Sequence, residues 1–172
     1  MRTLALAIAL SLTTPLCADP APPQASASVA RLEVGVFCAL QAMDQRPAPG
    51  TLSGWIHVPD SVIDFHWPDR QVVPARIGLA FGVRSRLSPG LFLDGEMRVY
   101  RPGSPIPETW ESSFTDLSDQ FAFFRFDRED ELIAGPWRFE AWAGDEHLYT
   151  VPFEVVPADA LPEIAQACGA TS

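Results

Sequence analysis

Lysine is absent from the 172-residue sequence, and all 12 of its basic residues are arginines. The 22 acidic residues outnumber them and leave a formal net charge of −10. A surface of that sign repels nucleic-acid phosphates and anionic lipid head groups, so neither is an expected partner. The composition, 47% hydrophobic and 20% charged, is that of a globular protein.

The sequence also has no apolar run of about 20 residues, the length that a bilayer-spanning helix needs. Its first residues carry one positive charge, Arg2, then a short apolar stretch and small residues up to Ala18. This pattern predicts a secretory signal peptide over residues 1–18. A lipoprotein signal at Cys17 is the alternative, which the bulky Leu16 before it disfavours. We therefore expect a periplasmic or secreted protein without stable membrane insertion after signal cleavage.

Cysteine is scarce: Cys17 lies in the predicted signal, and only Cys38 and Cys168 follow it. In an oxidising compartment such a pair predicts one disulfide. The bond would close a loop of 168 − 38 = 130 positions, worth about 5 kcal/mol in the chain-entropy model. Two unpaired buried thiols are the alternative. A disulfide would leave no thiol as a nucleophile or metal ligand.

Helical periodicity is lacking between the signal and the C-terminal tail. Residues 19–28 are mostly Pro, Ala and Ser, which predicts a disordered lead. Short alternating segments separated by Pro, Gly and Asp then fill residues 29–157. They predict an all-β protein with a single antiparallel, immunoglobulin-like β-sandwich of about seven to eight strands. The clearest segments are 30–40, 77–87 and the hairpin 137–156; others are 52–58, after a turn-rich stretch at 45–50, then 63–67, 96–101, 109–115 and 121–126.

A short helical tail is predicted over residues 158–172. Leu161, Ile164 and Cys168 lie on one helix face by their three-four spacing. This face turns Cys168 toward the sandwich, as a disulfide to the inward-facing Cys38 requires. Two independent patterns therefore agree on a tail that is tethered by the disulfide.

Small residues occupy one face of the segment 77–87, where Gly78, Ala80 and Gly82 alternate with large apolar residues. Glycine is poor in strands, so its presence there needs a reason. Close approach of the N-terminal segment or of a partner subunit would supply one. We therefore regard this face as a possible protein-contact surface.

Four short segments of the chain occur together in a recognisable arrangement: Gly-Leu-Ala-Phe-Gly at 78–82, Phe-Asp at 126–127, Glu-Leu-Ile-Ala-Gly-Pro-Trp at 131–137 and Phe-Glu-Val-Val at 153–156. With them the chain resembles an uncharacterised bacterial family, domain of unknown function 3859, from about Leu32 to Val156. A more general resemblance, to the Leu-x-x-Gly-x-Trp-x-Phe edge of immunoglobulin-like modules, covers only the last hairpin. The family resemblance implies an immunoglobulin-like fold and no known activity, so it transfers no catalytic residue.

No two of the three histidines have the spacing of a chelating pair. Asp64 and His66 would share one face of a strand and are weak candidates for a metal site, which would need His57 or Asp69 as well. A solvated strand face is the simpler interpretation, so we predict no metal and no other cofactor. The acidic run 127–131 lacks the ligand alternation and the glycine of a calcium loop, and it is interpreted as a charged turn.

Motifs for nucleophilic catalysis are missing: the sequence has no Gly-x-Ser-x-Gly, no Ser-x-x-Lys and no His-Glu-x-x-His. A pair of carboxylates for glycoside hydrolysis stays open as an alternative, because an acidic chain always offers some pair at the required separation. Such a pair therefore carries no weight by itself.

Tryptophan is well represented, with five residues. Trp137 falls on the inward face of the hairpin and is assigned to the core. Trp67, Trp110 and Trp142 lie next to polar residues or turns and are candidates for stacking against a ligand such as a sugar ring. The alternative is that these side chains cover the edges of the sandwich.

Taken together, these patterns predict a non-catalytic binding or structural module for a protein partner in the envelope. One alternative is a module that binds carbohydrate or another polymer through its exposed tryptophans. Another is a hydrolase with an unrecognised carboxylate site. The sequence does not indicate an oligomeric state.

Overall fold

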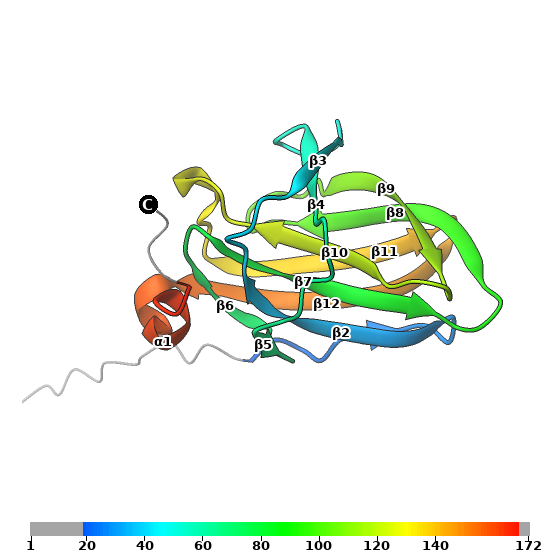
Figure 1. The fold of residues 1–172 in the computed structure, drawn as a ribbon, viewed down its shortest axis with the longest axis horizontal. Helices are drawn as coiled ribbons and strands as arrows, with labels where there is room; N and C mark the ends of the chain where they lie inside the picture. The colour runs from blue at the N-terminus through cyan, green and yellow to red at the C-terminus, as the bar shows by residue number, and fades with distance from the viewer. Residues whose placement is uncertain (1–18, 169–172) are drawn as a thin grey trace, which may run out of the picture.

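The computed structural model describes residues 19–168, which form two β-sheets packed face to face (Figure 1). Sheet A contains, in spatial order, β1 (Gln24–Ala25), β12 (Glu146–Pro157), β11 (Gly135–Ala143), β8 (Phe92–Tyr100) and β9 (Glu108–Thr115), with β6 (Val72–Ala75) beside the end of β12. Sheet B contains β10 (Gln120–Arg125), β7 (Leu79–Leu87), β2 (Val29–Cys38) and β5 (Trp67–Pro68). A separate hairpin joins β3 (Asp44–Pro47) to β4 (Trp55–Val58). The helical turns are η1 (Glu129–Glu131), η2 (Ala158–Ala160) and α1 (Pro162–Ala165).

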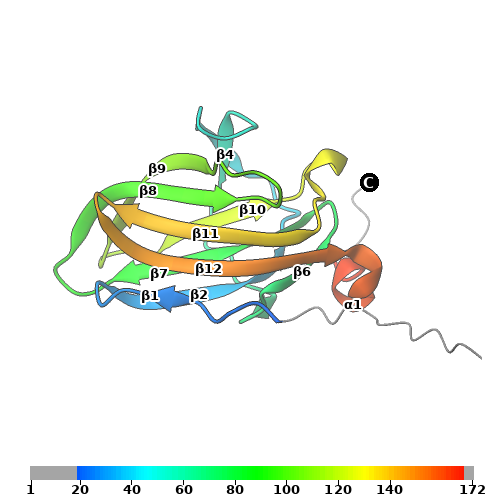
Figure 2. The same cartoon turned by 180° about the vertical axis from the view of Figure 1, so that it is seen from behind.

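The predicted fold class, an all-β antiparallel sandwich with a short C-terminal helix, is confirmed (Figure 2). Seven strands of six residues or more build the two layers, and the other strands are shorter pieces at their margins. One pairing departs from the antiparallel prediction: β6 runs parallel to the end of β12. No helix in residues 19–168 is long and apolar enough to cross a membrane.

The main core lies between the sheets and follows the predicted alternation of β11 and β12. Trp137 and Phe139 are 1% and 0% exposed, whereas Arg138 between them faces solvent. Phe81 of β7 lies among five aromatic rings, with ring centroids 5.0 Å from Phe153 and 5.6 Å from Trp137. A side chain fully buried in this way stabilises the fold by about 1.5–3 kcal/mol.

A second apolar cluster covers the outer face of sheet B and corrects one prediction. Gly78, Ala80 and Gly82 are buried by the chain itself, so they do not form a free protein-contact surface. Phe37 and Ile63 pack with Ala80 in this cluster, and further contacts come from Met43, Phe65, Phe121 and Phe123. Gly82 is required by close packing, since a Cβ atom there would lie 2.2 Å from the Ala122 carbonyl oxygen.

Arg84 fastens this outer cluster to β7. Its side chain is only 10% exposed, donates a hydrogen bond to the Ile63 carbonyl oxygen and lies 3.3 Å from a Glu33 carboxylate oxygen. Its guanidinium carbon also lies 5.4 Å from the Phe65 ring centre and 5.6 Å from that of Phe121. A buried arginine with these partners holds the loop 59–66 against the sheet.

The lead, residues 19–28, differs from the prediction of disorder. Gln24 and Ala25 form β1 and pair with Thr150 and Tyr149 of β12. The Ser26 N–H continues this pairing, with a 2.8 Å hydrogen bond to the Leu148 carbonyl oxygen. Unsatisfied backbone groups on the edge of β12 favour such pairing even for a segment without apolar periodicity. The predicted signal peptide, residues 1–18, lies outside the described residues.

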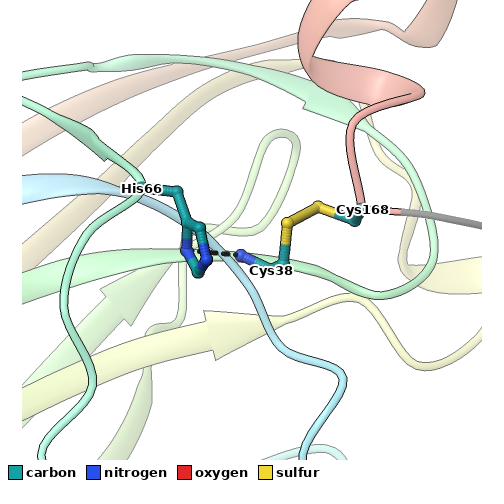
Figure 3. The surroundings of a disulfide bond; sticks show 3 residues. All are labelled: Cys38, His66 and Cys168. Carbon is teal, nitrogen blue, oxygen red and sulfur yellow. Dashed lines mark hydrogen bonds between the residues drawn. A yellow bond between two sulfur atoms is a disulfide. The ribbon is translucent and has the colours of Figure 1, made fainter.

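The predicted disulfide joins Cys38, at the end of β2, to Cys168, with 5.3 Å between the two Cα atoms (Figure 3). The Cys38 N–H donates a 3.3 Å hydrogen bond to Nδ1 of His66. Ile164 and Cys168 are buried against the main core as predicted, but α1 is only four residues long and Cys168 lies in a turn beyond it rather than on its face. The tail is therefore covalently tied to the end of sheet B; its residues 169–172 lie outside the described part.

The strand boundaries in the first half of the sandwich depart from the sequence pattern. The stretch 45–50, expected as a turn, begins inside β3, and the strand expected over 52–58 shortens to β4. The segment expected as a strand over 63–67 is a loop that enters β5 only at its end. Ile63 and Phe65 in this loop cover sheet B instead of extending it, because their packing against the sheet outweighs the local preference for a strand.

Candidate functional site

The β3–β4 hairpin lies over β9, at the open side of the sandwich where the edges of the two sheets meet (Figure 1). Backbone pairing fixes it there: the Thr109 N–H donates a 3.0 Å hydrogen bond to the Gly50 carbonyl oxygen. The Leu52 N–H donates to Oε2 of Glu108 at 3.0 Å, and the Arg46 guanidinium donates to the Glu111 carbonyl oxygen, also at 3.0 Å. Between the hairpin, β9 and β10 lies a pocket of about 200 Å³, which we call the seam pocket.

Aromatic side chains form the apolar part of the seam pocket. Trp55 comes from the hairpin, Trp110 from β9, and Phe123 and Phe124 from β10. Within residues 19–168, neither indole N–H of Trp55 and Trp110 donates a hydrogen bond, although the indoles of Trp137 and Trp142 both do. The pocket therefore offers flat apolar walls together with two unused donors.

A histidine–aspartate pair lies at the polar side of the seam pocket. Nε2 of His57 lies 2.7 Å from a carboxylate oxygen of Asp127, and Arg125 contacts the other oxygen. Burial alone would raise the pKa of Asp127, but the His57 hydrogen bond and the positive charge of Arg125 together lower it. The carboxylate is consequently ionised at neutral pH.

A buried ion pair borders the pocket on the sandwich side. Arg101 and Glu108 contact each other, and their side chains are 8% and 12% exposed. The Arg101 guanidinium carbon lies 4.6 Å from the ring centre of Phe124, close enough for a cation–π interaction. Glu131 at the same end accepts hydrogen bonds from two N–H groups, those of Asp127 and Arg128. These contacts hold the charged groups in place before any ligand binds.

The polar groups of the seam pocket differ in how they are engaged by the rest of the chain. The hydroxyls of Thr51 and Ser53 hydrogen bond to the carbonyl oxygens of Ala48 and Trp55, and Nδ1 of His57 is buried without a partner in the described residues. A general acid needs a carboxyl group whose pKa is raised, and the pKa of Asp127 is lowered.

Exposed apolar side chains form a rim around the pocket. Leu52 is 74% exposed, and Trp55, which also lines the pocket, is 41% exposed. Ile106, 77% exposed, joins Leu52 at an adjoining hollow that shares Thr51, Val99, Arg101 and Glu108 with the seam pocket. Apolar surface gathered around one pocket is characteristic of an interaction site.

The structure separates the three tryptophans predicted to stack on a ligand. Trp110 lines the seam pocket, whereas Trp67 packs against the main core from β5, at the far edge of sheet B. Trp142 lies on the outer face of sheet A, stacked on His147 with 4.4 Å between ring centres. Only Trp110 lines the candidate site.

The two weak metal candidates are not brought together with further ligands. Asp64 has a 93% exposed side chain 3.8 Å from Arg84, and His66 is engaged by the backbone of Cys38. Both residues lie in a loop rather than on a shared strand face. In the described part of the chain, no three His, Cys, Asp or Glu side chains cluster as a metal site would require.

The fold defines the class of the protein, an all-β immunoglobulin-like sandwich. The chain belongs to the family described as domain of unknown function DUF3859, whose model matches residues 25–155, so the family resemblance seen in the sequence is confirmed. No curated protein matches the chain. A similar solved structure is an immunoglobulin-like protein from Pseudomonas aeruginosa, with 19% identity and a TM-score of 0.48, covering 80% of this chain and 98% of that one.

Sequence reasoning missed most of the seam pocket. It considered His57 only for a metal site, Asp127 as part of a charged turn and of a segment that carries the family resemblance, and Trp55 as no more than one of five tryptophans. The pocket residues come from three distant stretches of chain. The family segments at 126–127 and 131–137 contribute Asp127 and Glu131 to one of these stretches, but the family implies no activity for them. Only the excess of tryptophan pointed toward recognition.

Proposed function

We propose that the protein is exported and serves as a non-catalytic binding module that receives an apolar side chain of an envelope protein partner in its seam pocket. The observation that carries this proposal is the pocket itself, with four aromatic walls and an apolar rim at the edge of a rigid sandwich. Binding energy at protein interfaces concentrates where a large side chain fills a desolvated pocket. The disulfide supports export, because such bonds persist in oxidising compartments.

The size of the pocket favours one side chain over a free small molecule. Pockets for drug-sized ligands enclose about 300–1,000 Å³, and the seam pocket encloses about 200 Å³. The carbohydrate alternative loses support because Trp67, Trp110 and Trp142 lie on three different surfaces. The hydrolase alternative loses support because the carboxylates of the pocket contact arginine or histidine partners.

Site-specific crosslinking tests the proposal. A photo-crosslinking amino acid replaces Leu52 at the rim, and in a matched control it replaces Leu117, which is 87% exposed on the loop between β9 and β10. With an envelope extract of the source bacterium, we expect one protein to crosslink from position 52 and not from position 117. Equal labelling from both positions, or none from either, would contradict the proposal.

The captured partner is then purified and titrated by calorimetry. Trp110→Ala should weaken its binding by about tenfold or more, as expected for the loss of an anchor contact. Trp142→Ala, which removes a tryptophan outside the pocket, should bind like the wild type. Circular dichroism confirms that both variants are folded. Unchanged affinity of Trp110→Ala would show that the pocket does not receive the partner.

A further inference from the structure

A second unassigned surface of the described chain is the free edge of β9. β9 is the last strand of sheet A, and its outward backbone groups belong to alternate residues. The hairpin uses those at the start of the strand, through Thr109 N–H and the Glu111 carbonyl. Within residues 19–168 nothing pairs with the Glu111 N–H or with the backbone of Ser113. Figure 2 shows the hairpin over one end of β9 only.

A surface hollow adjoins this free edge. It is lined by Arg46 together with Asp94, Gly95 and residues 111–113 of β9. Glu111 and Ser113 are both exposed. An unpaired strand edge beside a hollow matches what strand addition needs: backbone groups to pair with, and room for the alternate side chains of the added strand.

Charge decides what kind of strand fits. Glu111 lies directly opposite Glu96 on β8, an unfavourable like-charge pair, and Asp94 lies opposite Ser113. Glu96 is paired with Arg98, but no cation contacts the carboxylates of Glu111 or Asp94 in the described residues. With a net charge of −10 on each chain, two copies repel each other at this edge. The acidic groups disfavour pairing of this edge with an acidic strand and favour pairing with a basic one.

We propose that the edge of β9 from Glu111 to Thr115 binds an extended, positively charged peptide segment as an added strand. The inference rests on the proposed function, because it names the form and charge of a segment of the partner. Backbone hydrogen bonds to Glu111 and Ser113 supply register, and the carboxylates of Asp94 and Glu111 select lysine or arginine in the segment.

The test uses a fluorescein-labelled synthetic peptide of alternating lysine and threonine, and fluorescence anisotropy at low and physiological salt. We expect the wild-type chain to bind it and binding to weaken as salt rises. A peptide with glutamate in place of lysine should not bind. The decisive probe is the lysine peptide with alternate backbone nitrogens methylated, which should bind about tenfold or more weakly because its donors are lost.

A variant of the chain gives the matching result from the protein side. Ser113→Pro removes an N–H that faces away from β8, where proline is tolerated at a sheet edge. It should reduce affinity for the lysine peptide by about tenfold. Ser113→Ala keeps this N–H and loses only the 2.8 Å hydrogen bond from its hydroxyl to Asp94, so it should reduce affinity much less. Amide exchange should slow at Ser113 when the peptide is bound to the wild-type chain. Because the methylated peptide is tested on the wild-type chain, the conclusion does not depend on the folding of Ser113→Pro.

Three results would overturn the inference: no binding of the lysine peptide, equal binding of the methylated peptide, or self-association of the wild-type chain that Ser113→Pro abolishes. The second result would reduce the effect to surface charge, and the third would make a second copy the occupant. Crosslinking from position 52 combined with no peptide binding would leave the seam pocket proposal standing alone. Peptide binding without crosslinking from position 52 would contradict the seam pocket proposal and leave strand addition at β9 standing.

Discussion

The two sheets of the sandwich meet their surroundings in opposite ways. Sheet B is covered on its outer face by the loop 59–66 and by a second apolar cluster around Phe37. Sheet A leaves its outer face to solvent and lines it with arginine and aromatic pairs, such as Arg98 over Trp142 and Arg138 over Tyr100. The same fold thus contains one layer buried on both sides and one that is half exposed, and each leaves a different pattern in the sequence.

The largest difference is expected between the main core and the cover of sheet B. Phe81→Ala, at the centre of the sandwich, should reduce the free energy of unfolding by about 3–5 kcal/mol. Phe37→Ala should cost about 3 kcal/mol, at the lower end of that range, because the loop above it can relax into the space. Urea denaturation of both variants measures the difference. Equal losses would mean that the cover is as tightly packed as the core.

The next largest effect on stability is expected for Arg84, which holds the loop 59–66 against sheet B. Arg84→Met leaves the Ile63 carbonyl oxygen without its donor and should cost about 1–3 kcal/mol. Arg86→Met is the matched control from the same strand face: Arg86 is 40% exposed and pairs with Asp119 at 2.7 Å. Its loss should cost less than about 1 kcal/mol. Similar costs in thermal denaturation would remove the special role of Arg84.

A smaller effect is expected on the open face of sheet A. The Arg98 guanidinium carbon lies 4.7 Å from the Trp142 ring centre, which corresponds to a coupling of about 0.5–1 kcal/mol. A double-mutant cycle of Arg98→Met and Trp142→Leu measures that coupling directly. A coupling near zero would mean that the contact between Arg98 and Trp142 does not stabilise the outer face of sheet A.

The smallest effect on stability is expected at the seam pocket, where the contribution of Asp127 depends on pH. The pKa of Asp127 is lowered in the folded state, so its contribution to stability is present above the ordinary carboxyl pKa of about 3.9 and is lost as pH falls through the folded value. The carboxylate is a third exposed, which limits the contribution to less than about 1 kcal/mol. Asp127→Asn should flatten the decline in urea stability below about pH 5. An unchanged acid slope in this variant would contradict the pairing of Asp127 with His57.

The contrast between the sheets explains which parts of the fold could be predicted from sequence. The hairpin of β11 and β12 was predicted nearly to its ends because Trp137 and Phe139 on the inner face alternate with the polar residues Arg138 and Glu140 on the outer face. The small residues at and beside the start of β7 predicted the close approach of another element, either the N-terminal segment or a partner subunit, and this face was considered a possible protein-contact surface. Nothing in a local pattern distinguishes a face open to a partner from one covered by the chain's own loop.

The seam pocket could not be predicted for a related reason. His57 and Asp127 are 70 positions apart, and their pairing follows from the docking of the β3–β4 hairpin on β9. That docking depends on the backbone contact between Gly50 and Thr109 and on contacts of Glu108 and Arg46 with distant backbone groups, none of which a local pattern encodes. Trp110 was predicted, together with Trp67 and Trp142, as a candidate for stacking on a ligand because it lies next to polar residues.

The bond between Cys38 and Cys168 also has a mechanical consequence. A pull on the two ends of the chain travels along β2 to Cys38 and crosses directly to Cys168, so the strands between them bear no tension. Of the described residues, the segment from residue 19 to Cys38 is the part outside the loop closed by the disulfide, and its full extended length is roughly 70 Å at about 3.5 Å per residue. Under load the N-terminal segment would extend, while the part of the chain closed by the disulfide would bear no tension. The seam pocket and the edge of β9 lie within that closed part.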